Sequence, residues 1–472
     1  MKHKFLLFFL AAFIVRAITF YGYIQHEQRY CQPDTPGYTQ PALALYYGHG
    51  MMQPNGNPVF WRTPGYPIFL APFYAFSQTP SWQFEMHEAA YKIALWVQIA
   101  WCSLLPILLY ILALLLTSSV AIAYIMAIVG ILHPGFVLAS TFLLTDGPAQ
   151  IFFVLFLICF LKTIYSRRLR HPYAYLAAAA LALGLYTWMR PMGQFVALVA
   201  LLIAPFFPVP LREKIKHALF FIIIFGATIA PWFVRNYQLT GKVFFCPLFG
   251  LYFNVFNAPK VRARVENIPH ELAWKKQCYD AEQLVKQEYQ RHAQEGTRLA
   301  IVNEMICMQS ALPWLVNYPH YVAYDWFIEV CKTVFDLYSY QFVSLYNNTF
   351  KWDPLVEYLG DKFCDTLYSK PLPWYVRLMA YLELLSEIII WMGIFTGLAL
   401  LMMPDFRKKF LTLWIPCGLL IGAVVCQTGG FGYARLRLPI EPLILILGLT
   451  FWFFVYQQMS RKNGTSLRTV AK

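Results

Sequence analysis

Long apolar runs recur along the whole chain, and they limit what it can fold into more than any other feature. Runs of roughly 17–25 apolar residues match the length of a helix that crosses a bilayer. Only 13% of the 472 residues are charged, too few for the polar surface of a soluble protein of this length. We therefore predict an all-α polytopic membrane protein with about ten transmembrane helices. The predicted spans are 5–24, 93–116, 119–140, 147–165, 173–189, 191–207, 218–234, 376–403, 411–427 and 439–457.

The basic residues between the spans predict how the chain is oriented. Segments 166–172, 210–217 and 404–410 and the tail from 460 are rich in Lys and Arg, and all fall on the side of the N-terminus. Because cytoplasmic loops carry the excess of Lys and Arg, we expect both termini to be cytoplasmic in a multi-pass protein of the inner (plasma) membrane. No small-residue cleavage site follows the first run, which we expect to be a retained span. This topology accounts for the net charge of +14, so the charge indicates no nucleic-acid partner.

Two long segments fall on the opposite, outer (periplasmic) side in this topology. The predicted division is a membrane catalytic module at 1–234 with a first outer loop at 25–92, a mostly helical outer segment at 235–375, and C-terminal transmembrane helices with a cytoplasmic tail at 376–472. Residues 318–346 are rich in aromatic side chains, which favours a helix lying at the membrane interface.

Any chemistry is expected in the outer segments or in the interior of the bundle. The cytoplasmic loops are too short to hold a nucleotide-binding domain, and the chain has no Walker A motif, dinucleotide fingerprint or D-x-D pair. Its ten cysteines are scattered without a C-x-x-C pair, which argues against a metal ribbon or a redox motif and leaves their disulfide state open. Since nucleotides are scarce outside the cytoplasm, an activated donor would have to arrive attached to a lipid.

Two aspartates are candidates for catalysis. Asp34 lies between Pro33 and Pro36, about ten residues after the first span, where it could form a turn, cap a helix, or serve as a general base or metal ligand at the membrane surface. Asp146 lies between the third and fourth spans, where either a tight polar turn or a second carboxylate of the same cavity explains it. Within a span, such an acid would cost roughly 2.5–3.5 kcal/mol on insertion scales.

Several arginines lie on the outer side, away from the basic loops. Arg190 and Arg235 lie at the outer ends of spans, Arg435 and Arg437 precede the last span, and Arg16 lies within the first span. They could anchor the protein to lipid headgroups. Alternatively, they could bind a lipid phosphate through bidentate hydrogen bonds.

Six segments in one order resemble a known family. They are PDTPGYTQPALALYYGHG, FWRTPGYPIFLAPFYA, LLTDGPAQIFFVLF, MRPMGQFVALVALL, APWFVRNYQLTGKVFF and ARLRLPIEPLILIL, which start at positions 33, 60, 143, 189, 230 and 434. Together they resemble the bacterial branch of the polytopic GT-C glycosyltransferases, which is related to the dolichyl-phosphate-mannose protein mannosyltransferases and to the lipid A aminoarabinose transferase. Residues from about 260 to 375 match nothing in that family.

The resemblance implies a polyprenyl-phosphate sugar donor and transfer to an envelope acceptor on the outer face of the membrane. It places an essential acid in the first outer loop, at Asp34, and a second acid after the third span, at Asp146. Some relatives have an acidic pair in the first loop, whereas Thr35 follows Asp34 here, so a divalent metal stays open. Glu85, His87 and Glu88 could supply ligands, although such a group is more often a solvated helix face.

The expected mechanism is a single inverting displacement with Asp34 as the base. Asp146 would orient the acceptor or share a metal. The substrate-binding candidates are Arg16, Arg62, Tyr66, Arg190, Arg235, Asn236, Arg435 and Arg437. Among them we expect Arg235, Arg435 or Arg437 to hold the phosphate, with help from Arg16 or Arg190.

The partners expected are the lipid-linked donor, membrane lipids and a glycan, lipid or protein acceptor. Two other functions stay open. One is a transporter or flippase of a lipid-linked glycan, and the other is an envelope scaffold that binds a partner through 235–375.

Overall fold

The computed structural model describes residues 2–25, 28–77, 87–165, 170–203, 209–296, 299–338, 374–401, 404–428, 432 and 434–462. Within these ranges the regular secondary structure is helical. One isolated antiparallel β-bridge, between Met52 and Pro58, lies in a loop between the helices. The predicted all-α polytopic fold is confirmed. By length and composition, six of the described helices can cross a membrane, or seven if one bent pair forms a single span.

Each predicted span overlaps a helix or two consecutive helices. The bundle comprises α1 (Lys2–Thr19) with η1 (Phe20–Ile24), α4 (Glu88–Cys102), α5 (Leu105–Thr117), α6 (Val120–Leu132), α7 (Pro134–Thr141), α8 (Asp146–Tyr165), α9 (Pro172–Met189), α10 (Gly193–Ile203), α11 (Leu211–Thr240), α20 (Trp374–Leu400), α21 (Pro404–Val425) and α23 (Glu441–Lys462). Two of the predicted spans, 191–207 and 411–427, contain the shorter apolar helices Gly193–Ile203 and Leu413–Val425.

The third predicted span is bent rather than straight. Helices α6 and α7 meet at an angle of 44° at His133. Pro134 follows this residue, and proline both lacks a backbone N–H and disfavours a helical conformation in the residue before it. The bend carries α7 into the protein, where all its residues from Gly135 to Thr141 are buried. The start of α8 is therefore buried as well.

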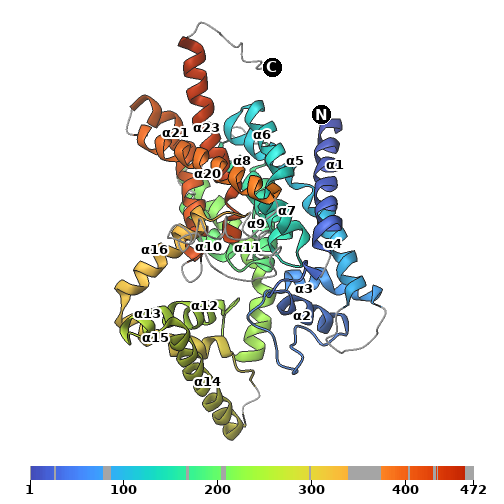
Figure 1. The fold of residues 1–472 in the computed structure, drawn as a ribbon, viewed down its shortest axis with the longest axis vertical. Helices are drawn as coiled ribbons and strands as arrows, with labels where there is room; N and C mark the ends of the chain where they lie inside the picture. The colour runs from blue at the N-terminus through green and yellow to red at the C-terminus, as the bar shows by residue number, and fades with distance from the viewer. Residues whose placement is uncertain are drawn as a thin grey trace.

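The elements of the two segments predicted to be outer lie at one end of the bundle, opposite the first residue of α1 and the last turn of α23 (Figure 1). The first outer loop contains α2 (Pro36–Tyr46), α3 (Gly65–Leu70) and η3 (Ala71–Phe76). The second outer segment contains α12 (Leu248–Tyr252), η5 (Phe253–Asn257), α13 (Ala258–Val265), α14 (His270–Glu295), α15 (Asn303–Asn317) and α16 (Pro319–Phe335). In Figure 1, α16 leads from the α12–α15 group back towards the bundle.

Two apolar cores hold the loop and the bundle together. The larger core joins α5, α6, α8, α9, α11, α21 and α23, and the smaller one joins the first outer loop to α4 and to residues 138–144. The backbone N–H of Leu143 donates to the carbonyl of Tyr30 at 2.9 Å, across the smaller core. This packing brings the turn before α2, which carries Asp34, beside the start of α8, which carries Asp146.

Candidate active site

Asp34 lies in a turn that is fastened to the segment before α8. The hydroxyl of Thr35 donates to the carbonyl of Leu143 at 3.2 Å and accepts from the N–H of Gln32 at 2.8 Å. Thr35 is the N-cap residue of α2 but makes no side-chain capping bond. The Asp34 carboxylate is bound by arginines instead, so neither side chain caps the helix. The hydrogen bonds of Thr35 therefore fix the turn and, with it, the direction of the Asp34 carboxylate.

Two arginines bind the Asp34 carboxylate. Arg62 donates to its Oδ1 at 2.6 Å, and Arg435 donates to its Oδ2 at 3.3 Å. Burial opposes ionisation of this group, but the charges of Arg62 and Arg435 and their hydrogen bonds outweigh it and hold the pKa of the Asp34 carboxyl below its ordinary value. The carboxylate is thus ionised at neutral pH.

Asp146 is the first residue of α8 and accepts from two arginines as well. Arg190, which follows α9, donates to its Oδ1, and Nε of Arg435 donates to its Oδ2 at 2.8 Å. Because the Asp146 side chain is buried, an unpaired charge there would be strongly destabilising, and the arginines compensate it. Arg435 therefore bridges the two aspartates, although it lies 289 and 401 residues from them in the chain.

The three arginines and two aspartates form one charged cluster, defined as Asp34, Arg62, Asp146, Arg190 and Arg435. All four carboxylate oxygens accept a hydrogen bond from a guanidinium group. Three positive charges against two negative charges leave a formal net charge of +1. The cluster can therefore accept an anion without a further change in protonation.

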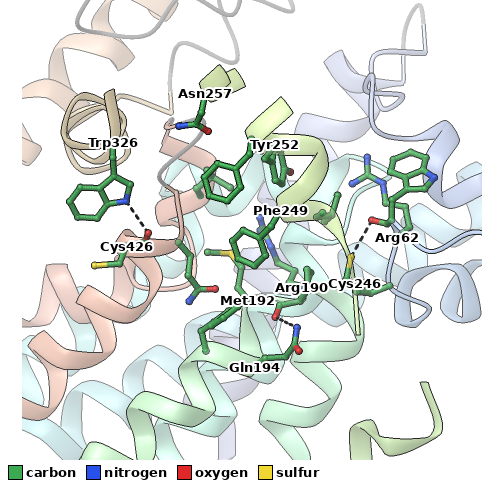
Figure 2. A pocket seen from close by; sticks show the side chains of 18 of the residues that line it. Arg62, Arg190, Met192, Gln194, Cys246, Phe249, Tyr252, Asn257, Trp326 and Cys426 are labelled. Atoms are coloured by element: carbon green, nitrogen blue, oxygen red, sulfur yellow. Dashed lines mark hydrogen bonds between the residues drawn. The ribbon is translucent and has the colours of Figure 1, made fainter. Parts of the chain in front are cut away.

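The charged cluster lies at a cavity of about 550 Å³, and four of its five members line that cavity. The opposite wall is apolar and aromatic, with Phe195, Phe249, Phe253, Val322 and Trp326. Figure 2 shows Phe249, Tyr252 and Met192 inside this cavity, with Arg190 beside them. A cavity with cationic groups and an apolar wall suits a ligand that has an anionic head and an apolar body.

Arg62 is held in place by aromatic side chains. Its guanidinium carbon lies 4.5 Å from the ring centroid of Tyr38 and 4.4 Å from that of Trp61. The hydroxyl of Tyr38 also accepts a hydrogen bond from Arg62 at 3.0 Å. This stacking limits the freedom of the side chain, so little conformational entropy is lost when it binds an anion.

Five of the predicted substrate-binding residues lie outside the lining of the cavity and bind other groups of the fold. Arg16 donates to the carbonyls of Ala12 and Gly130, at 3.2 and 2.9 Å, within the bundle. The hydroxyl of Tyr66 donates to Gln98 at 2.7 Å. Both side chains satisfy buried polar groups of the fold.

Arg235, Asn236 and Arg437 have structural partners too. Arg235 donates to the carbonyls of Val59 and Met51, and Asn236 donates to those of Phe244 and Phe245. Arg437 donates to the carboxylates of Glu387 and Glu441 and to the carbonyl of Val334. Three of the predicted arginines, Arg62, Arg190 and Arg435, thus reach the cavity.

Part of the cavity comes from residues that no motif indicated. Helix α12 and the π-helical turn η5 contribute Phe249, Tyr252 and Phe253, and α16 contributes Val322 and Trp326. The segment predicted to lie at the membrane interface, 318–346, includes α16, which lines the cavity. The rest of that segment, the aromatic run LYSYQFVSLY, lies mostly outside the described residues. The high proportion of aromatic residues in 248–256 is the sequence feature that could have indicated this part of the cavity wall.

The charged cluster does not fit a resident divalent metal. Such ions prefer several carboxylate or carbonyl oxygens, whereas each oxygen of the two carboxylates here already accepts from a guanidinium group and the cluster is net positive. In the described parts of the chain, no three His, Cys, Asp or Glu side chains converge on a possible metal position. His87 contacts Ser77 and Glu88 pairs with Lys92, while Glu85 lies outside the described residues.

No protein-family model matches the chain, and no curated protein matches it. Among solved structures, the chain is similar to the archaeal oligosaccharyltransferase AglB from Archaeoglobus fulgidus, in complex with an inhibitory peptide and a dolichol-phosphate, at a TM-score of 0.50 and 13% identity. That match covers 100% of this chain and 52% of AglB, so the chain spans about half the length of that protein.

ArnT from Cupriavidus metallidurans also matches at 13% identity and a TM-score of 0.37, both in the apo state and bound to undecaprenyl phosphate. These matches cover 95% and 98% of this chain and 77% and 80% of ArnT. The predicted resemblance is thus confirmed at the level of the fold, through the likeness to AglB. The chain therefore shares the membrane-spanning helical fold seen in AglB.

Proposed function

We propose that this protein is an integral membrane glycosyltransferase that moves a sugar from a polyprenyl-phosphate donor to an acceptor of the cell envelope, on the outer face of the membrane. The observation that carries the proposal is the charged cluster of three arginines and two aspartates beside an apolar cavity. The GT-C fold and the dolichol-phosphate in the AglB structure support it. Both termini would be cytoplasmic, at the end of the bundle opposite the cavity.

The arginines would bind the phosphate of the donor. Arg62, Arg190 and Arg435 line the cavity, and guanidinium groups form bidentate hydrogen bonds with phosphate oxygens. The aromatic wall formed by α10, α12 and η5 would contact the first units of the prenyl chain. As the bond to the sugar breaks, negative charge develops on the phosphate, and arginines already in place stabilise it.

The two aspartates would have different roles because their exposure differs. The Asp34 side chain is 34% exposed, whereas that of Asp146 is 1% exposed. An acceptor hydroxyl can therefore approach Asp34 but not Asp146. We assign Asp34 as the general base and Asp146 as the anchor that orients Arg190 and Arg435.

The reaction would be a single displacement with inversion at the anomeric carbon. The acceptor hydroxyl gives its proton to Asp34 while its oxygen forms the new bond to the anomeric carbon. The bond from that carbon to the phosphate oxygen breaks with its electron pair, and polyprenyl phosphate leaves. Paired with two arginines, Asp34 is a weak base. A phosphate that draws Arg62 and Arg435 towards itself would strengthen it.

Mass spectrometry of envelope glycolipids and glycoproteins tests this function. The comparison needs a native strain, a deletion strain, and deletion strains complemented with Asp34→Asn or Glu88→Gln, with protein insertion measured in each. Glu88 is a matched control because it is an exposed acid, 49% accessible and paired with Lys92. We expect one glycan to lose a single sugar in the deletion, restored by Glu88→Gln but not by Asp34→Asn.

Two other results would count against the proposal. Restoration by Asp34→Asn would refute its assignment as the base. Accumulation of a complete lipid-linked glycan in the deletion strain, with sugar transfer still active there, would favour the transporter or flippase instead.

A further inference from the structure

Arg435 bridges both aspartates from a helix of only four residues, α22 (Ala434–Arg437), so other elements must fix its position. Two carboxylates from α16 and its C-terminal end bind the backbone beside it. Glu329 accepts from the N–H of Gly432 at 2.6 Å, and Asp336 accepts from the N–H of Ala434 at 3.1 Å. The second bond is one residue from Arg435 itself.

The backbone approaches α16 closely at Gly432. A β-carbon at this position would lie 1.8 Å from the carbonyl oxygen of Glu329 and 2.9 Å from Oγ1 of Thr333. Only glycine allows this approach. The hydrogen bond and the close packing together specify one arrangement of Gly432 on α16.

Helix α16 is itself anchored in the outer segment. Asp325, Glu329 and Thr333 are four residues apart, which places them on one face of the helix, and all three are buried. Asp325 pairs with Arg264 at 2.6 Å, and Glu329 pairs with Lys260 at 2.5 Å, both from α13. The polar face of α16 thus connects α13 to the backbone that carries Arg435.

Asp336 differs from the other buried acids of this region. Within the described parts of the chain it makes no ion pair, and its oxygens accept from the backbone N–H groups of Leu337 and Ala434. Glu329, by contrast, also pairs with Lys332. Replacing Asp336 therefore removes a bond to the α22 backbone without breaking a salt bridge.

We propose that Asp336, supported by Glu329, is a positioning residue that holds Arg435 where its guanidinium can reach the donor phosphate. This inference rests on the proposed function, because it takes Arg435 as a phosphate ligand. It gives the outer segment a specific role in the reaction: α16 sets the geometry of the charged cluster, in addition to lining the cavity.

Equilibrium binding of undecaprenyl phosphate to the purified full-length chain tests the proposal. The variants are Asp336→Ala, Asp336→Asn, Arg435→Gln and the double variant Asp336→Ala/Arg435→Gln, each checked by thermal unfolding. Asp325→Ala is the matched control, because Asp325 is a buried acid of the same helix that pairs with Arg264 instead of the α22 backbone.

We expect Asp336→Ala to weaken binding by about tenfold, as the loss of one charge-assisted bond does. Asn has one acceptor oxygen, which can keep the bond to the Ala434 N–H while the bond to Leu337 is lost, so Asp336→Asn should bind within about threefold of the native protein, as should Asp325→Ala. In the Arg435→Gln background, Asp336→Ala should add nothing, since it acts through Arg435.

Three outcomes would overturn the proposal. Native affinity in Asp336→Ala, with weak binding in Arg435→Gln, would reject the positioning role and leave the proposed function standing. Losses that multiply in the double variant would show that Asp336 acts independently of Arg435. Native affinity in Arg435→Gln would reject the phosphate site itself, and the positioning role with it.

Discussion

Replacing Arg435 with glutamine should weaken binding of undecaprenyl phosphate without unfolding the protein. In the structure its side chain is 12% exposed and its guanidinium contacts Asp34 and Asp146. A hydrogen bond to a charged group contributes roughly 1.5–3 kcal/mol, which corresponds to about 10- to 150-fold in Kd. Because the guanidinium must give up Asp34 before it binds phosphate, we expect a loss near the lower end, about tenfold to thirtyfold.

Arg235→Gln is the matched control for this prediction. Arg235 is also predicted to lie on the outer side, but it donates to the carbonyls of Val59 and Met51 and does not line the cavity. Its loss should leave the Kd unchanged within about threefold while lowering thermal stability, since two carbonyls lose a donor at roughly 1–3 kcal/mol. Equilibrium binding of radiolabelled undecaprenyl phosphate in detergent, with unfolding temperatures for each variant, measures both effects. Native affinity in Arg435→Gln, or an equal loss in Arg235→Gln, would refute the assignment.

Three further predictions concern stability. Asp146→Asn and Arg190→Met should each destabilise the protein by roughly 3–5 kcal/mol, because each leaves a buried charge without its partner. The double variant should lose less stability than the sum of the two single losses. Strictly additive losses in thermal unfolding would contradict a buried pair. Gly65→Ala should destabilise the protein by roughly 1–3 kcal/mol, because its β-carbon would lie 2.7 Å from the carbonyl oxygen of Trp188. An unchanged unfolding temperature would show that the backbone at Gly65 moves away from Trp188 at little cost. Burial raises the pKa of Asp336 to about 6, so the folded protein binds this proton more tightly than the unfolded chain does. Stability should therefore fall as the pH rises from about 4 to 6, by at most about 3 kcal/mol, and Asp336→Asn should remove that slope in a pH series of unfolding measurements.

Much of the fold could be predicted because its strongest constraint is local. A bilayer requires about 20 consecutive apolar residues for each helix, so the spans can be found without knowing their neighbours. The bend at His133 is partly local too, since Pro134 marks it. The short helix α10 is harder to judge, because its length of 11 residues depends on the helices that surround it.

The candidate site could be predicted only in part. Asp34 and Asp146 stand out because carboxylates are rare beside apolar runs, and the structure brings them together around Arg435. The arginines could not be separated by sequence position alone. Arg435 and Arg437 are two residues apart, yet one lines the cavity while the other is enclosed with Glu387 and Glu441.

The residues alone specify an all-helical membrane architecture and the chemical groups available to the site, which are carboxylates and guanidinium groups at the ends of apolar helices. Which of these groups meet depends on the packing of segments that are far apart in the chain. Side-chain direction within a short helix such as α22 depends on the backbone bonds that Glu329 and Asp336 accept, from residues about 100 positions earlier in the chain. Such contacts leave no periodic pattern in the sequence, because each depends on one hydrogen bond between distant segments rather than on a repeated spacing.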